Sequence, residues 1–519
     1  MRIKYLILFI CLLEISCSDF LEEHSQDQTY IRSANDLEEL LLGEGYMKVY
    51  PSDVVDFQTA YYPWLHFISD ETQETDDAGG YSWCRSYDTR EAIFGYYTWQ
   101  QRAGVNETGT AYKNESGDWD RLYNHINICN SILESVKDLP GDEQNSEKCK
   151  QILGETYFLR AAYYWILVNL YAKPYSPETA TQDAGIPLKL TGYIEDKIFS
   201  RNSVEEVYRQ IMQDLEDSEK FISQGKHDGS IYQIDSIGLF LFRSRVSLYM
   251  QNWNDAERYA RKVILSRPEL IDLNNFSGGF LSKDGVETLF SMGGHSLISN
   301  IRYEFKSFRV SDVLYDSYKE EDIRKKMFFY KHDKFIGYTK LAGLGSGDPT
   351  AASYYRTNYS TPYSNQKIEV SDNFLLRTAE AYLNLSEALA YQDRDDEARN
   401  TLKILQDKRF RTGYTPTQAT GKELIQIIRE ERRHELALEG HRWFDLRRYS
   451  ACKKYPESKA ISQYFIVYES RLSFNISERR LYTLDAFDEG YTLGIPNEVI
   501  VFNTGMEQNP RPVRNYVIQ

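Results

Sequence analysis

The sequence predicts a mainly α-helical protein, built on a helical-repeat scaffold that long irregular segments interrupt. Two observations favour this fold: apolar residues recur at helical spacing over several paired segments, and two of those pairs resemble one another. The chain has 519 residues, which is enough for a large hydrophobic core. No stretch rich in proline, glycine or serine divides the sequence, so we expect one domain over residues 17–519.

The helical periodicity predicts three antiparallel helix pairs and one further helix. The further helix spans residues 203–223, with Ser203 as its N-cap and Glu206 in the capping-box position. Short polar turns separate the two members of each pair, so the members should lie side by side. The predicted pairs are residues 118–138 with 148–171, 234–250 with 254–265, and 373–391 with 395–407.

The last two helix pairs look like degenerate copies of one unit. Tyr249 precedes Ala256 by seven residues across a polar turn, and Tyr391 precedes Ala398 by the same interval. A small residue just after such a turn lets two helices approach closely, as in tetratricopeptide-like repeats. The scaffold is therefore expected to be a stack of such pairs.

Three long segments interrupt or follow the predicted helices. We name them the early insertion (residues 51–117), the middle insertion (268–372) and the closing insertion (453–519). Segments this long without regular structure are usually functional or disordered, and these contain too many aromatic residues for disorder. We expect short strands within them, and we expect them to form the ligand face.

The stretch from Ile428 to Arg448 reads IREERRHELALEGHRWFDLRR and combines many charges with buried-type aromatic residues. Gly440 interrupts it, as the end of a helix or a tight turn would. His434 and His441 lie seven residues apart, whereas a zinc protease needs HExxH with the two histidines one turn apart. The pattern favours a structural Arg–Glu network over an active site or a metal site.

Charge and motifs exclude several functions. The formal net charge is −16, which argues against nucleic acid as a partner and against polybasic membrane binding. The sequence contains no GxSxG nucleophile elbow and no GxxxxGK[ST] phosphate loop, so we expect no catalytic residues. The cysteines lack CxxC spacing, which argues against zinc. Cys129 and Cys149 lie on neighbouring predicted helices, and a disulfide between them is left open.

An acidic run offers the one candidate for a metal ion. Carboxylate oxygens in such a run are calcium ligands in other proteins, but this run lacks the spacing of a known calcium loop. We favour a solvated loop and expect no cofactor. The run comprises Asp70, Glu71, Glu74, Asp76 and Asp77.

The N-terminus resembles a bacterial lipoprotein signal. Arg2 and Lys4 precede a short apolar run that ends near Cys17, and the run is too short to span a bilayer. Glu14 departs from the usual apolar residue at its position. Residues 1–16 are the expected signal peptide, and Cys17 is the expected lipidation site, where three acyl chains would anchor the protein firmly. The alternative is a cleaved secretory signal followed by a chance cysteine.

Aromatic side chains in the insertions are the candidate ligand contacts. One face of a sugar ring stacks on an aromatic ring, while the sugar hydroxyls need short polar partners. Residues 79–85 read GGYSWCR, in which two glycines precede two aromatics and an arginine. The alternative for each candidate is a loop aromatic packed on the scaffold. The candidates are Trp83, Tyr81, Arg85 and Trp64 in the early insertion, and Tyr303, Arg302, Tyr354 and Tyr355 in the middle insertion.

Several segments, in order along nearly the whole chain, resemble those of the SusD/RagB family of Bacteroidetes outer-membrane nutrient-binding lipoproteins. The resemblance does not extend in detail to the three insertions. The similar segments are CSDFLE after the signal, WDRLYNHINICNSIL (119–133), GETYFLRAAYYWILVNLYAKPY (154–175), SVEEVYRQIMQDLEDS (203–218), the repeat at 248–264, FLLRTAEAYLNLSEALA (374–390), the stretch at 428–448, and YTLGIPNEVIVFNTGMEQNP (491–510).

The resemblance implies about four tetratricopeptide-like helix pairs and a binding function without catalysis. It implies a lipid-anchored protein on the extracellular side of the outer membrane, whose partner is a SusC-like TonB-dependent barrel. The ligand would be an oligosaccharide or polysaccharide, or else a peptide or another nutrient. In such proteins the ligand surface draws on the early and middle insertions, which supports Trp83 as the first candidate. The rival hypotheses are a surface glycoside hydrolase, for which the sequence offers no acid/base pair, and a purely structural helical scaffold.

Overall fold

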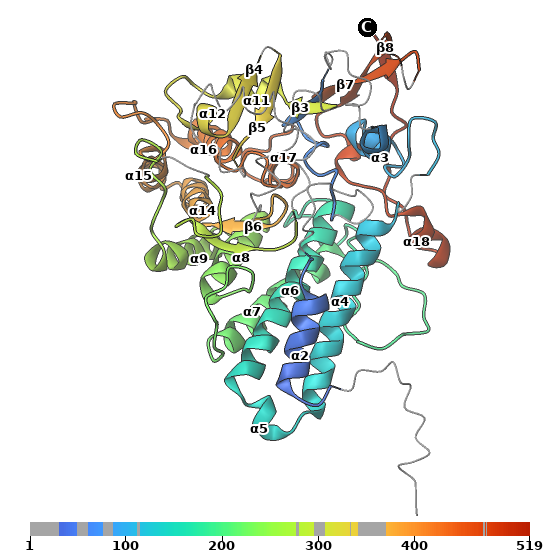
Figure 1. Ribbon diagram of the computed structural model, residues 1–519, viewed down its shortest axis with the longest axis vertical. Coiled ribbons are helices and arrows are strands. Elements are labelled where there is room, and N and C mark those ends of the chain that lie inside the picture. The colour runs from blue at the N-terminus through green and yellow to red at the C-terminus, as the bar shows by residue number, and fades with distance from the viewer. Residues whose placement is uncertain are drawn as a thin grey trace, which may run out of the picture.

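A computed structural model describes residues 31–48, 61–75, 87–111, 115–276, 280–294, 307–332, 334–340, 370–470, 473 and 475–519. Long helices form the lower part of the molecule as drawn in Figure 1, and short helices and strands form the upper part. The fold is helix-rich with a few small sheets, as the sequence predicts. Within the described residues no helix is both long enough and apolar enough to cross a membrane.

The scaffold consists of helices that pack as neighbours along the chain. Helix α6 packs against α4 and α7, α8 against α9, and α14 against α9, α15 and α16. Both members of each predicted pair are present, so the predicted pairing is confirmed. The scaffold elements are α2 (Ala34–Leu40), η1 (Leu41–Gly45), α4 (Gly117–Ser135), η3 (Val136–Asp138), α5 (Gly141–Gln144), α6 (Glu147–Tyr171), α7 (Val204–Ile222), α8 (Ser236–Tyr249), α9 (Trp253–Ser266), α14 (Thr378–Tyr391), α15 (Asp395–Gln406), α16 (Gly421–Glu435) and α17 (Arg442–Ser450).

Local signals set several helix ends as predicted. Ser203 caps α7 by accepting a hydrogen bond from the backbone N–H of Glu206, whose side chain accepts one in return from the backbone N–H of Ser203. Gly440 lies in the turn between α16 and α17 with a φ of +76°. A side chain at that φ would be strained, which explains the glycine.

One helix start differs from the prediction. Helix α14 begins at Thr378, whereas the sequence predicted a start at residue 373. The preceding residues form strand β6 (Leu375–Arg377), which pairs antiparallel with β2 (Thr288–Ser291) of the middle insertion. Pairing with a strand far away in the sequence overrides the local helical pattern.

The insertions contain short strands, as expected, and also short helices. Strand β1 (Thr72–Glu74) of the early insertion pairs antiparallel with β3 (Phe308–Val310) of the middle insertion. The closing insertion supplies a three-stranded sheet in the order β7-β8-β9. The remaining elements are α3 (Tyr87–Tyr97), α11 (Asp312–Ser317), α12 (Arg324–Met327), β4 (Phe329–His332), β5 (Phe335–Tyr338), β7 (Ile461–Tyr468), β8 (Ile476–Leu484), η4 (Glu489–Tyr491), α18 (Asn497–Phe502) and β9 (Tyr516–Ile518).

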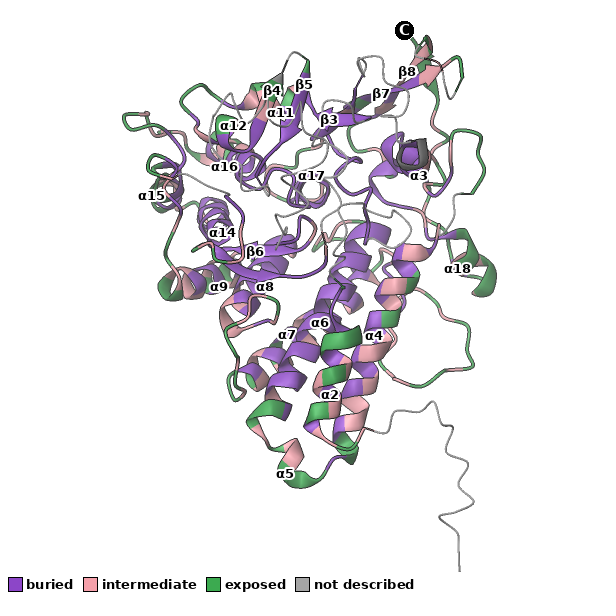
Figure 2. Cartoon of the chain, viewed as in Figure 1, coloured by how far each residue is buried: buried purple, intermediate pink, exposed green. Residues whose placement is uncertain are grey.

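Burial shows how the core is arranged. Helix α6 is buried along most of its length, whereas α2 and α4 expose residues along one face (Figure 2). The large apolar cluster includes residues from the scaffold and from all three insertions, so the insertions share its core. Cys129 of α4 and Cys149 of α6 are both buried free thiols. The disulfide that the sequence left open is therefore not formed.

Candidate ligand-binding face

The early and middle insertions are joined to α16 and α17 by buried ion pairs. Arg442, at the start of α17, donates two hydrogen bonds to Asp70 of the early insertion, at 2.7 and 2.9 Å. Arg433 lies 3.3 Å from the same carboxylate. Burial alone would raise the pKa of Asp70, but Arg442 and Arg433 hold it well below its usual range. Next to it, Glu71 accepts the backbone N–H of Leu438 at 3.1 Å.

Glu435 is the centre of a second group of ion pairs. Its carboxylate accepts hydrogen bonds from Arg324 of the middle insertion at 2.9 Å, from Arg377 at 2.6 Å and from Arg409 at 2.9 Å. All four side chains are almost completely buried. Burial alone would raise the pKa of Glu435, but the three arginines hold it well below its usual range. The sequence-based expectation of a structural Arg–Glu network at residues 428–448 is thus confirmed.

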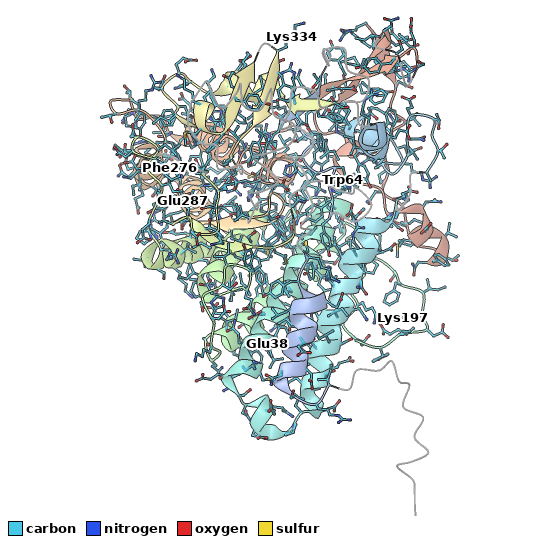
Figure 3. All side chains as sticks on the ribbon, in the orientation of Figure 1. Glu38, Trp64, Lys197, Phe276, Glu287 and Lys334 are labelled. Atoms are coloured by element: carbon cyan, nitrogen blue, oxygen red, sulfur yellow. The ribbon has the colours of Figure 1, made fainter. Side chains whose placement is uncertain are left out.

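The same network extends further into the middle insertion. Glu287, labelled in Figure 3, accepts hydrogen bonds from Arg377 at 3.0 Å and from Arg409 at 2.6 Å. Lys340 donates to the backbone carbonyl of Glu435 at 2.7 Å and also forms an ion pair with Glu439. These contacts fix the base of the insertions on the scaffold.

The preferred interpretation of the acidic run was wrong for the residues that the structure describes. Asp70, Glu71 and Glu74 are buried rather than solvated. Glu74 forms an ion pair with Arg90 at 2.5 Å and accepts the backbone N–H of Ile466 at 2.8 Å. The charges are tolerated in the interior because each carboxylate has hydrogen-bond donors. Across the described part of the chain, no group of three or more His, Cys, Asp or Glu side chains is placed to hold a metal ion.

The other two acidic residues, Asp76 and Asp77, lie outside the described residues.

A cavity of about 490 Å³ lies between α3, the loop at residues 106–108 and strand β7. Phe94 and Phe465 form part of its wall and meet edge to face with their ring centroids 4.8 Å apart. The Arg90 guanidinium lies 4.6 Å from the Phe465 ring centroid and 5.5 Å from that of Tyr468. Asn106 and Thr108 add polar groups at the loop. An aromatic wall beside such polar groups suits a ligand with an apolar face and several hydroxyls.

This cavity lies next in sequence to the first candidate stretch. Helix α3 begins at Tyr87, two residues after the GGYSWCR segment that contains Trp83. Sequence reasoning did not single out Arg90, Phe94, Phe465 or Tyr468 as cavity residues. The β-branched and aromatic residues of β7 (ISQYFIVY) were a usable sequence signal for a strand, but nothing local indicated that this strand packs against α3.

Trp64 lies inside the fold (Figure 3). Only 3% of its surface is exposed, its indole N–H donates to Asp118 at 2.8 Å, and its ring stacks on Tyr96 with centroids 4.3 Å apart. This packing is that of a structural aromatic, so we no longer consider Trp64 a ligand contact. The other candidates lie outside the described residues: Cys17, Tyr81, Trp83, Arg85, Arg302, Tyr303, Tyr354 and Tyr355.

The fold is that of a helical-repeat protein whose long insertions lie together on one side of the scaffold. Two family models match the chain. The model described as "SusD family" matches residues 301–511, and the model described as "Starch-binding associating with outer membrane" matches residues 19–237. The chain belongs to the SusD family.

Individual relatives agree with this assignment. The chain is 24% identical to SusD-like protein P38 of Formosa agariphila over 383 residues, which cover 63% of this chain and 71% of that protein. It is also 24% identical to SusD-like protein P2 of the same organism over 378 residues, covering 64% of this chain and 71% of that protein.

Solved structures share the fold. A SusD superfamily protein from Bacteroides vulgatus superposes with a TM-score of 0.66 at 19% identity, covering 93% of this chain and 100% of that one. A putative sugar binding protein from the same organism gives a TM-score of 0.64 at 20% identity, covering 93% and 99%. At these identities the likeness establishes the fold alone.

Proposed function

We propose that this protein is a cell-surface lipoprotein that binds a glycan on its insertion face and delivers it to a SusC-like TonB-dependent transporter in the outer membrane. Family membership supports a binding role without catalysis. One matching family model is described as "Starch-binding associating with outer membrane", and one structural relative is a putative sugar binding protein. No cofactor is part of this proposal.

The observation that carries the glycan proposal is the cavity beside α3. Its wall combines Phe94, Phe465 and Tyr468 with the polar groups of Asn106 and Thr108. The charge of Arg90 is already balanced by Glu74, so the cavity does not demand an anionic ligand. A sugar supplies both an apolar ring face and hydroxyls, which are the features that such a wall recognises.

The candidates outside the described residues keep their proposed roles as further ligand contacts. Trp83 is the first of them, because its segment leads directly into α3. Its ring would extend the aromatic wall, and the Arg85 guanidinium would donate to sugar hydroxyls. The other proposed contacts are Tyr81, Arg302, Tyr303, Tyr354 and Tyr355.

The position of the N-terminal helix supports an anchor remote from the ligand face. The backbone N–H of Ala34, the first residue of α2, donates to Glu143 of α5 at 3.0 Å. Helix α5 lies at the lower end of the molecule in Figure 1, whereas α3 and β7 lie near the upper end. If Cys17 is lipidated, residues 18–30 would span at most roughly 45 Å. Such a tether would attach at the end of the scaffold opposite the insertion face, so the anchor would not cover that face.

The anchor and the partner are tested in cells that carry the native protein with an affinity tag. We expect the wild-type chain in the outer membrane, accessible to protease on intact cells, and co-purifying with a TonB-dependent barrel. The Cys17→Ala variant should leave the membrane fraction, because its acyl anchor would be missing. A wild-type chain that protease cannot reach on intact cells, or that purifies without any barrel, would contradict the proposal.

A further inference from the structure

We propose that a second cavity, between the early insertion, the end of α6 and the closing insertion, is a separate binding site for a neutral sugar of one or two rings. The cavity has a volume of about 540 Å³. Its wall is formed by the loop at residues 101–104, by Tyr96 and Tyr171, and by residues 493–497 and 508–512. It shares no lining residue with the cavity between α3 and β7.

The wall on the closing side is held in place by two amide side chains. Gln508 accepts the backbone N–H of Ile495 at 2.7 Å and donates to the carbonyl of the same residue at 2.8 Å. Asn509 donates to the carbonyls of Tyr171 and Leu493, both at 2.7 Å. These bonds fix the closing segment against the end of α6. The cavity is therefore preformed, and a ligand would not need to order its wall.

Two tyrosine hydroxyls in this cavity point to a ligand. Tyr96 is 9% exposed and Tyr171 is 3% exposed, and both line the cavity. Among the described residues, neither hydroxyl has a hydrogen-bond partner. Burial raises the pKa of both hydroxyls, so both remain protonated donors at neutral pH. Neither hydroxyl oxygen is completely enclosed by protein atoms, so a sugar in the cavity would find both as open hydrogen-bonding groups.

The charges around the cavity favour a neutral ligand. Arg102 forms an ion pair with Glu115. The Arg511 guanidinium donates to the backbone carbonyls of Gln100, Gly490 and Thr492, so its N–H groups are not directed at a ligand. Glu489 adds a second carboxylate to the lining. Among the described residues of the lining, a phosphate or a sugar acid would find no cation directed at it, whereas the amides and tyrosine hydroxyls suit a polyhydroxylated neutral molecule.

Gly494 gives a direct way to fill the cavity. It lines the cavity, and a Cβ atom built on it would have its nearest neighbours at 3.4 Å (Gln508 Oε1), 3.7 Å (Arg511 Cδ) and 3.7 Å (Gln101 carbonyl O). These are ordinary contact distances, and its φ lies outside the left-handed region. Gly494→Leu should therefore fold and occupy the cavity, and Gly494→Ala is the matched control that leaves most of the space open.

The test is saturation-transfer difference NMR on the soluble chain with maltose, cellobiose, xylobiose, mannobiose and lactose as probes. We expect at least one probe to bind the wild-type chain and the Gly494→Ala variant, and to lose its signal with Gly494→Leu. Equal melting temperatures of the two variants would exclude misfolding as the cause. The proposal would be overturned if no probe bound the wild-type chain, or if every probe that bound it kept its signal with Gly494→Leu.

A second set of variants tests the hydroxyls themselves. Tyr96→Phe and Tyr171→Phe each remove one hydroxyl without a described partner, so neither should lower the melting temperature. Each should weaken the binding of the same probe by roughly three- to tenfold, the usual effect of losing one neutral hydrogen bond. Unchanged affinity in both variants would overturn the proposed contacts.

This inference fails separately from the proposed function. A chain that binds disaccharides in this cavity but no polysaccharide would contradict the proposed function alone. A chain that binds a polysaccharide but shows no effect of Gly494→Leu on any disaccharide would contradict this inference alone.

Discussion

Arg442 and Asp70 form a two-bond buried ion pair between residues 372 positions apart in the chain, at 2.7 and 2.9 Å. One partner begins α17 of the scaffold, and the other lies just before strand β1 of the early insertion. Strand β1 in turn pairs with β3 of the middle insertion. The ion pair therefore joins the scaffold to the early insertion, which the β1–β3 pairing joins to the middle insertion.

Replacing Arg442 should destabilise the protein strongly. Arg442→Ala removes the two-bond donor of the buried Asp70 carboxylate, and loss of such a partner typically costs about 3–5 kcal/mol of unfolding free energy. Lys459 at 2.7 Å and Arg433 at 3.3 Å remain beside Asp70, so we expect a cost at the lower end of that range. Arg442→Lys should recover only part of the loss, because an ammonium group cannot form the same parallel pair of bonds. Urea denaturation followed by near-UV circular dichroism measures both changes.

The control for Arg442 is Arg258→Ala, which breaks an exposed pair with Asp255 at 2.8 Å. The Arg258 side chain is 56% exposed, so solvent screens this pair and its loss should cost under about 1 kcal/mol. Similar losses for Arg442→Ala and Arg258→Ala would contradict the role assigned to the buried network.

Replacement of Gly440 by alanine should lower the unfolding free energy more than the same replacement at Gly413, another glycine with positive φ. A Cβ atom at Gly440 would lie 2.9 Å from the backbone oxygen of Asn373, and its φ is +76°. Gly413 has a φ of +94°, but a Cβ atom there would meet nothing within 4 Å. Gly413→Ala should cost about 1–2 kcal/mol from the left-handed backbone alone. Gly440→Ala should cost at least about 1 kcal/mol more, because a backbone atom must also move.

Thermal and urea denaturation of both alanine variants, measured in parallel, compare these costs. If Gly440→Ala is no less stable than Gly413→Ala, the close packing of this turn against residue 373 is wrong.

Glu155 should make stability depend on pH near neutrality. Burial raises its pKa to about 7, although Gln151 and Tyr46 donate hydrogen bonds to the carboxylate. The unfolded chain titrates near the ordinary value of 4.5. The folded state therefore holds the proton more tightly. The resulting stability is fully present below pH 4.5 and is lost as pH rises through about 7.

The Glu155→Gln variant isolates this effect, because its side chain does not ionise. The unfolding free energy of the variant minus that of the wild-type chain should increase by on the order of 1–3 kcal/mol from pH 5 to pH 8. Urea denaturation of both chains at the two pH values measures the difference. A difference that does not change with pH, or that changes in the opposite direction, would contradict a buried Glu155 with a raised pKa.

The sequence predicted the scaffold well because its signals are local. Helical spacing of apolar residues and the Ser203–Glu206 capping box act within a few residues of each helix end. The start of α14 was predicted wrongly because Leu375–Arg377 pairs with a strand nearly ninety residues earlier in the chain. No window around residue 375 contains that information.

The site was harder to predict because long-range contacts decide it. Asp70 reads locally as part of a solvated acidic loop, and only the position of Arg442 explains its burial. Trp64 reads as a loop aromatic, yet Tyr96 and Asp118 enclose it. The aromatic wall beside α3 combines residues that lie more than 350 positions apart, such as Phe94 and Phe465. Aromatic content alone indicates that insertions matter, but not which rings face a cavity.

The most direct test of a glycan receptor is titration calorimetry of the soluble chain from Ser18 to Gln519 against plant, host and fungal polysaccharides. We predict binding to at least one of them, weakened by more than about tenfold in Trp83→Ala, as for other aromatic hot spots. Tyr193→Ala is the control, because Tyr193 is a 61% exposed aromatic outside the three insertions and should not affect binding. A chain that binds none of the polysaccharides but binds peptides would contradict the account.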